Sequence, residues 1–331
     1  MIASKVLLEG PLKKKEGSYL LSGRFGYPGV VAGLLGSNLT SKPQMWFYDV
    51  NAKVNRTLDA RNRMFFSLYS GGDHTVFNKL VKGYGMDWGN ATATIRWNHI
   101  LNDKTNVNTS AVFSNYYYKY KSLSDGLRYV WKSNMQSYQL KSDWERYQNN
   151  LLTLKGGVNL HYFTTMPGEV GKSGKDSNIT PSQMPRKSLW DAALYAEANY
   201  KFLPRFLLNA GVRLSVLHAP ASAYYAAKTF VMPEPRAELS FIPNASHRFS
   251  ASYTQAAQSI HMLTTSSVGI PSDMWMPANA LLKPSVMRQL ALGYEYNFPD
   301  KEYTLSLEHI CAGQAMWWII GKMPIFFRMT G

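Results

Sequence analysis

The sequence predicts an all-β protein in which one antiparallel sheet forms a transmembrane β-barrel. Three observations lead to this prediction. Apolar and polar residues alternate along most of the chain, which is the periodicity of strands with one apolar and one polar face. Short and long connections between these strands alternate, and aromatic residues make up 14% of the sequence. Barrels that span a membrane combine short turns at one end, long loops at the other and aromatic residues at both interfaces.

About fourteen segments show the strand pattern. In the segment 47–57 apolar residues occupy most even positions, whereas Asp49, Asn51 and Lys53 occupy odd positions. The same alternation recurs at 90–100, 188–203, 206–216 and 290–298. Many of these segments contain ten residues or more, which is the length of a tilted strand that crosses a bilayer.

The connections indicate which face of the strands contacts water. Tight turns are expected near residues 13, 58, 101, 148, 203, 243 and 299. Between them lie long segments near 28–45, 71–89, 119–136, 164–187, 218–232 and 255–287. A sandwich or a propeller has no reason to keep every long connection at one end. We therefore expect the apolar face to contact lipid and the polar face to line a lumen, with the long loops outside the cell.

The polar face of the strands supplies the residues that we expect to line the lumen. These candidates are Asp49, Asn51, Lys53, Arg96, Arg213, Arg236, Glu238, Arg248 and Glu295. The alternative is that each is an ordinary solvated residue of the wall.

The long loops are the expected place for ligand recognition if the barrel imports a ligand. The segment "GIPSDMWMPANALLKP", residues 269–284, contains the first candidates, Asp273 and Trp275. Trp275 can equally be a packing residue that orders a long loop. Trp88 and His74, in the long segment 71–89, are the other candidates.

Composition argues against several other classes of protein. The net charge is +15, but lysine and arginine are scattered and "KKK" at 13–15 is the only tight run, so no nucleic-acid partner is predicted and membrane lipid is the expected anionic surface. The single cysteine, Cys311, excludes a disulfide framework. The histidines do not have metal-ligand spacing, and no nucleophile with a base is apparent. We predict no enzyme, no metal site and no cofactor.

Several segments together resemble the barrel of a TonB-dependent outer-membrane receptor. They include "LLEGPLKKKEGSYLLSGR" at 7–24, "FYDVNAKVNRTLD" at 47–59, "LYAEANYKFLPRFLLNAGVR" at 194–213 and "GIPSDMWMPANALLKPSVMRQLALGYEYNF" at 269–298. The resemblance extends to about Glu308 and is to the type that has a carboxypeptidase-regulatory-like domain ahead of the plug. It implies a 22-stranded barrel in the outer membrane of a Gram-negative bacterium, closed by a plug. It also implies import of a siderophore, cobalamin, glycan or peptide with the TonB complex, and a surface lipoprotein as a further partner.

The sequence differs from this family in having no counterpart of the signal peptide, the TonB-contacting segment, the plug or the first barrel strands. We therefore expect an incomplete barrel, with about 14 of the 22 strands of the family, that would not import a ligand alone, because unpaired strand edges are not tolerated in lipid. Two alternatives stay open. One is a passive porin-like channel, and the other is a soluble carbohydrate-binding β-protein.

The alternating pattern stops after Glu308, in "HICAGQAMWWIIGKMPIFFRMTG". Because methionine and tryptophan each have one codon, "MWWIIGKMPIFF" read one nucleotide earlier is compatible with "NVVDYRENADFF", which is typical of a strand and turn of such receptors. We predict that residues 1–308 are a partial barrel and that residues 309–331 are translated out of frame. The alternative is an ordinary hydrophobic hairpin.

Overall fold

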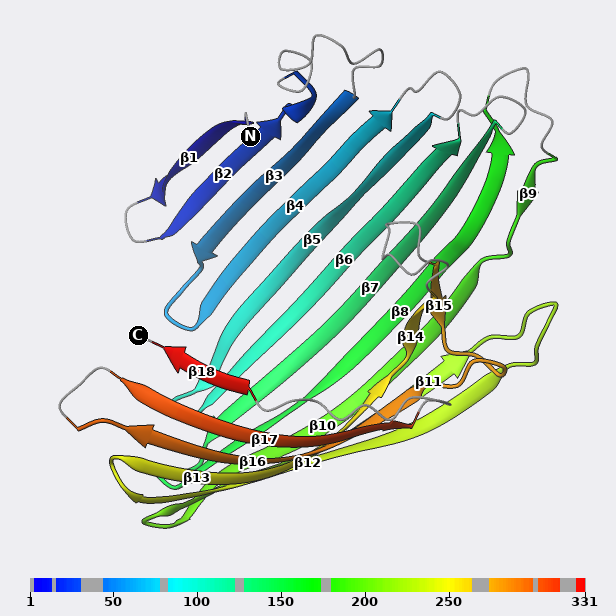
Figure 1. Cartoon of the computed structure of the whole chain (residues 1–331). Coiled ribbons are helices and arrows are strands. Elements are labelled where there is room, and N and C mark those ends of the chain that lie inside the picture. The colour runs from blue at the N-terminus through cyan, green and yellow to red at the C-terminus, as the bar shows by residue number, and fades with distance from the viewer. Residues whose placement is uncertain are drawn as a thin grey trace.

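The computed structural model describes residues 3–13, 16–30, 44–77, 83–122, 128–173, 180–263, 274–299, 303–315 and 326–330. Most of them belong to one large antiparallel sheet that curls around a concave side (Figure 1). The predicted class, an all-β antiparallel barrel sheet, is confirmed. Each strand pairs with the next along the chain, with two exceptions. β8 pairs with β10, and β13 pairs with β16, while the hairpin β14–β15 forms a separate small sheet.

The first part of the sheet contains the strands β1 (Ala3–Lys13), β2 (Gly17–Gly26), β3 (Gln44–Thr57), β4 (Asn62–Phe77), β5 (Tyr84–Asn102), β6 (Thr105–Ser122), β7 (Tyr129–Tyr147) and β8 (Leu152–Lys172). The second part contains β10 (Lys187–Leu203), β11 (Phe206–Ala219), β12 (Lys228–Asn244), β13 (His247–Gln258), β16 (Ser285–Asn297), β17 (Thr304–Ala315) and β18 (Phe326–Thr330). The short strand β9 (Ser182–Gln183) pairs with β8. The separate hairpin consists of β14 (Ile260–Leu263) and β15 (Met274–Pro277).

The tight turns are closed by short polar side chains that accept hydrogen bonds from the backbone. Asp59 accepts the N–H of Arg61 at 2.7 Å, and Asn149 accepts the N–H of Leu152 at 2.9 Å. Such side chains favour the turn over continued strand because they replace a backbone partner. The hydrogen bond from the Arg61 backbone also lowers the pKa of Asp59.

Several long connections are shorter than the sequence predicts, because strands extend into them. β4 and β5 continue to Phe77 and from Tyr84, and so occupy most of the predicted segment 71–89. Within that segment Gly72 pairs with Gly89, and the rings of Tyr48 and Tyr117 occupy the space beside them. The predicted segments 119–136 and 164–187 are shortened in the same way, by β6 and β7 and by β8.

The hairpin β14–β15 identifies the inner face of the sheet. Its residue Ile260 packs against a buried cluster that includes Phe163, Leu189 and Leu217. Figure 1 shows the hairpin on the concave side of the sheet. Because side chains alternate between faces, every residue in register with these three positions also points inward.

The outer face is apolar and exposed. On β10 the outward residues between Trp190 and Tyr200 are alanines and Leu194, whose exposed fraction is 62%. The two aromatic residues are 53% and 41% exposed. Ten residues at about 3.3 Å each span roughly 33 Å, which a tilt of about 40° reduces to roughly 25 Å. This equals the height of the apolar band of an outer-membrane barrel, with an aromatic residue at each border.

β17 runs from Thr304 to Ala315 and pairs with β16 along that whole length, so the strand passes Glu308 without interruption. In the part of the chain that the structure describes, no helix is both long and apolar enough to span a membrane.

Candidate functional site

The inner face is the candidate functional site, because it brings together charged residues from many strands. The structure places all nine lumen candidates on this face. When the register is followed from strand to strand, Asn51 lies in line with Phe163 and Leu189 of the buried cluster. In the same way Lys53 lies in line with Leu217. The other seven follow from the same alternation along their strands and from ion pairs across them; they are Asp49, Arg96, Arg213, Arg236, Glu238, Arg248 and Glu295.

On the wall formed by β10–β13, arginines face carboxylates of nearby strands. Arg236 pairs with Glu197 at 3.1 Å across β11, and Arg248 pairs with Glu238 at 3.0 Å. Arg213 lies 3.6 Å from Glu234. Each of these three arginines therefore has a carboxylate partner.

Glu234 has the richest set of partners on this wall. It accepts hydrogen bonds from the Ser215 hydroxyl at 2.6 Å and from the backbone N–H of Ala257 at 3.1 Å. Together with Arg213, these contacts join β11, β12 and β13.

A hollow of about 270 Å³ lies at the loop end of the inner face, on β2–β6. The ion pair of Arg24 and Asp49, at 2.6 Å, forms one side of it. Trp88 and Asp73, which pair in register, also line it. Carboxylates, a guanidinium group and aromatic rings in one hollow can orient a polar ligand and cover its apolar faces.

The four ligand-contact candidates lie in different surroundings. Trp88 is in β5 rather than in a loop, and it lines the loop-end hollow. His74 is in β4 and points to the outer face, where it binds Asp87 and stacks on Trp46 with ring centroids 5.0 Å apart. Trp275 is half-buried in β15. Asp273 lies outside the described residues.

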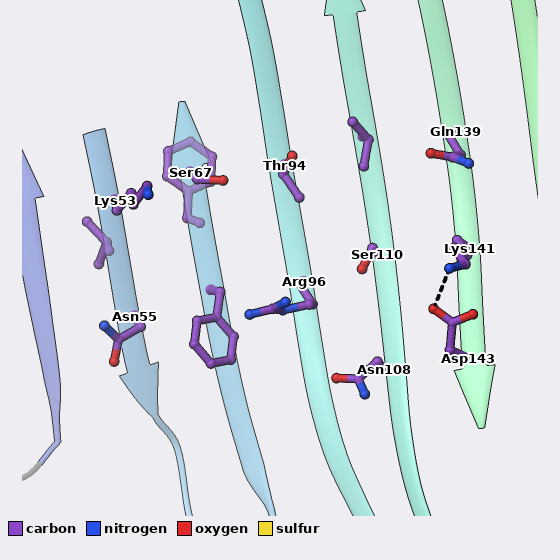
Figure 2. Close-up of a pocket in the computed structure, with 14 residues that line it drawn as sticks. Lys53, Asn55, Ser67, Thr94, Arg96, Asn108, Ser110, Gln139, Lys141 and Asp143 are labelled. Atoms are coloured by element: carbon purple, nitrogen blue, oxygen red, sulfur yellow. Dashed lines mark ion pairs between the residues drawn. The ribbon is translucent and has the colours of Figure 1, made fainter. Parts of the chain in front are cut away.

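A larger cavity of about 640 Å³ lies farther down the inner wall, across β3–β7 (Figure 2). Lys53, Arg96 and Lys141 line it, and Asp143 is the only carboxylate among its lining residues. The other polar residues around it have hydroxyl or amide groups: Asn55, Ser67, Thr94, Asn108, Ser110 and Gln139. This arrangement can bind an anion and hydrogen-bond to it.

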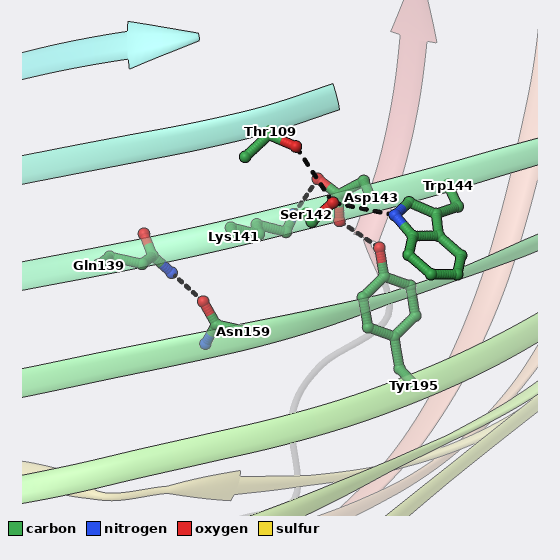
Figure 3. A network of polar contacts seen from close by, with 8 residues as sticks. All are labelled: Thr109, Gln139, Lys141, Ser142, Asp143, Trp144, Asn159 and Tyr195. Atoms are coloured by element: carbon green, nitrogen blue, oxygen red, sulfur yellow. Dashed lines mark hydrogen bonds and ion pairs between the residues drawn. The ribbon is translucent and has the colours of Figure 1, made fainter. Parts of the chain in front are cut away.

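Asp143 also links this wall to β10 (Figure 3). It pairs with Lys141 at 2.9 Å and accepts a hydrogen bond from the Tyr195 hydroxyl. The Tyr195 side chain reaches Asp143 across Gly157 of β8, the residue that pairs with both of them. A side chain at position 157 would collide with this contact.

The hairpin β14–β15 contains a buried histidine that the sequence did not single out. His261 is 2% exposed, and its Nε2 atom has no hydrogen-bond partner among the residues that the structure describes. Burial lowers the pKa of His261, because the protein interior disfavours the charged imidazolium. The histidine is therefore expected to be neutral when the hairpin is packed.

Sequence reasoning missed Lys141, Asp143, Tyr195 and Glu234. The first two lie on the same alternating pattern as the residues that were chosen, so the signal was present. Their importance depends on cross-strand partners, which only the register supplies. Within the described ranges, no three His, Cys, Asp or Glu side chains are placed to hold a metal ion.

Residues 32–308 match the protein-family model described as TonB dependent receptor-like, beta-barrel. No curated protein sequence matches the chain.

Solved structures provide similar folds at low sequence identity. The ferric yersiniabactin uptake receptor FyuA from Yersinia pestis has a TM-score of 0.70 and 11% identity over 94% of this chain and 52% of its own. The ferric-catecholate import receptor Fiu from E. coli K12 has a TM-score of 0.67 and 12% identity over 93% of this chain and 55% of its own. The copper transporter OprC has a TM-score of 0.68 and 12% identity over 93% and 51%. The chain thus spans about half the length of these structures.

Proposed function

This chain belongs to the TonB dependent receptor-like β-barrel family, and from that premise we propose that it forms part of the wall of a receptor in the outer membrane of a Gram-negative bacterium. The receptor takes up a ligand from outside the cell with energy from the TonB complex. The observation on which this rests is the family match over residues 32–308, on a sheet with an apolar outer and a polar inner face.

The two faces support the membrane part of the proposal. An exposed apolar surface of this extent is unfavourable in water but not in lipid. The charged inner residues need a polar lumen, because unpaired charges in hydrocarbon cost several kcal/mol.

Labelling of single cysteines tests this orientation in cells that express the chain with a leader for export. In a Cys311→Ser background, Ser222→Cys places a thiol in the connection between β11 and β12, and Ser246→Cys places one in the turn between β12 and β13. We expect a membrane-impermeant maleimide to label position 222 in intact cells and position 246 only after permeabilisation. Recovery of the chain in the soluble fraction would favour a soluble carbohydrate-binding protein instead.

The ligand that we propose is a siderophore, a glycan or a molecule of similar polarity, recognised at the loop end of the barrel. Trp88 in the loop-end hollow, Trp275 in the inner hairpin and Asp273, which lies outside the described residues, are the proposed contacts. Two of the similar structures are named as receptors for ferric siderophores, which supports a siderophore.

Uptake of radioactive iron as a ferric catecholate, by cells that express the gene from its own locus, tests this function. We expect accumulation that stops when the proton gradient is collapsed, and a Trp88→Ala variant with a weaker apparent affinity. Accumulation that continues without the gradient would indicate a passive porin-like channel.

We also propose that the reading frame changes near codon 308. The family match ends at residue 308, where the alternation of the sequence also ends. Resequencing of the genomic locus tests this proposal. A single-nucleotide shift that restores "NVVDY" supports it, and an unaltered sequence at that codon excludes it.

A further inference from the structure

The cavity of about 640 Å³ on the inner wall differs from the rest of the inner face in its charge. Figure 2 shows Lys53, Arg96 and Lys141 on β3, β5 and β7, all directed to the same side of the wall. Cations that are close together repel one another and favour an anion between them.

Within the described part of the chain, Lys53 and Arg96 form no ion pair with a carboxylate. Asp143 is bound by Lys141 and by the Tyr195 hydroxyl. Glu9 lies in register with Lys53, but it is on β1, two strands away, and Asp49 on β3 is paired with Arg24. The lining residues thus provide three cations and one carboxylate.

Arg96 is held in place without being neutralised. Its guanidinium carbon lies 4.4 Å from the centre of the Phe65 ring. Phe65 pairs with Arg96 in register, and Arg63 lies over the same ring at 5.0 Å. A ring orients a guanidinium group but leaves its N–H donors free to bind oxygen atoms.

Hydroxyl and amide groups complete the surroundings of these cations. Ser110 pairs with Arg96 on one side and with Lys141 on the other. Ser67 pairs with Lys53. Such groups can donate to or accept from a ligand that has both charged oxygens and hydroxyls.

We propose that this cavity is a binding site for a small polyanion with carboxylate or phosphate oxygens. Arg96 binds one oxyanion with its paired N–H donors, and Lys53 neutralises a second. Ser67 and Ser110 hydrogen-bond to the remaining oxygens. The inference concerns the wall itself and does not require that the chain import anything.

Calorimetric titration of the full chain, folded in detergent micelles, tests the site. The probes are citrate and inorganic pyrophosphate, each at fixed ionic strength. We expect saturable binding of at least one probe, and the preferred probe distinguishes a carboxylate ligand from a phosphate ligand. Arg96→Gln and Lys53→Gln should each weaken binding at least about tenfold, the loss of one charge-assisted contact.

Arg288→Gln is the matched control, because it removes the same charge from an exposed residue at the loop end of β16. It should bind the probe as the unmodified chain does. Equal weakening by all three variants would mean general attraction by the net charge and would overturn the proposal. Absence of binding of both probes to the folded chain would overturn it as well. So would tighter binding of poly-glutamate than of either probe, which would indicate an acidic polypeptide as the occupant.

Discussion

The β10–β13 wall and the β3–β7 wall have the same backbone architecture but differ in the partners of their charged side chains. On the former, Arg236 and Arg248 each face a carboxylate at about 3 Å. On the latter, Lys53 and Arg96 face hydroxyl groups and an aromatic ring. On the first wall these arginines are neutralised by carboxylates, whereas on the second wall Lys53 and Arg96 keep a positive charge that a ligand can neutralise.

The difference shows that strand alternation alone does not determine what a barrel wall does. Alternation places polar residues inward on both walls, but the register decides which residues become neighbours. A surface charge with an ordered partner contributes to stability, and one without a partner is available for binding. Four substitutions test this difference between the two walls.

The largest effect is expected where the two walls are joined. Gly157→Ala would put a methyl group against the Ser142 carbonyl oxygen and 2.9 Å from the Tyr195 ring. Overpacking of this kind costs about 1–3 kcal/mol and disrupts the Tyr195–Asp143 contact. We expect loss of the compact, heat-modifiable form on SDS gels. Gly171→Ala is the control, because no atom of the described residues lies within 4 Å of an added Cβ there, and it should leave the gel pattern unchanged.

The next effect concerns the balanced wall. Glu234→Gln leaves Arg213 without its carboxylate and weakens the contacts to Ser215 and Ala257. We expect unfolding in urea to become more favourable by about 1–3 kcal/mol. Glu9→Gln, on the exposed strand β1, should have no effect of this size. Equal midpoints for the two variants would show that the ion pairs do not stabilise this wall.

A smaller effect on stability, but a complete change in binding, is expected on the other wall. Ser110→Glu places a carboxylate between Arg96 and Lys141 and so supplies the missing partner. Cross-strand charge pairs contribute about 0.2–1 kcal/mol, so stability should stay constant or rise slightly. Titration with pyrophosphate or citrate should show no binding. Ser110→Gln introduces a side chain of nearly the same size without the charge and should weaken binding without abolishing it. Equal abolition of binding in both variants would contradict the electrostatic explanation.

The smallest effect concerns the hairpin β14–β15 that covers the inner face. Burial holds the pKa of His261 below its ordinary value of 6.5, so the unfolded chain binds a proton more readily than the folded chain. Above pH 6.5 the imidazole is neutral in both the folded and the unfolded chain, so its titration does not change the stability. As the pH drops below 6.5 toward the folded-state pKa, the unfolded chain binds the proton first and the stability falls. His261→Gln should show a flatter dependence of the urea midpoint between pH 7.5 and 5. An unchanged slope would exclude His261 as its source.

The alternation of the sequence was sufficient to predict the fold class and the face on which residues such as Asn51 and Lys53 lie. It was not sufficient for the strand ends. The segment 71–89 was predicted to be a long connection, but in the structure Gly71 and Gly72 lie within β4, where Gly72 leaves room for the rings of Tyr48 and Tyr117. His74 and Trp88 therefore lie in strands, and only Trp88 faces inward.

The partners of charged residues could not be predicted, because they depend on register across several strands. The hydrogen bond from Tyr195 to Asp143 joins residues 52 positions apart and crosses an intervening strand at Gly157. The burial of His261 has the same origin, since it depends on a hairpin that folds back onto β8 and β10. No local pattern in the sequence specifies these contacts.

If the sheet has a lipid face and a lumen face, two adjacent residues of β7 must differ in their access to lipid, and fluorescence quenching measures that access. In the Cys311→Ser background, Leu140→Cys places a label on the outer face and Lys141→Cys places one on the inner face. In vesicles that contain lipids with a spin label on the acyl chain, we predict strong quenching at position 140 and little at position 141. Equal quenching at both positions, or the reverse order, would contradict this account.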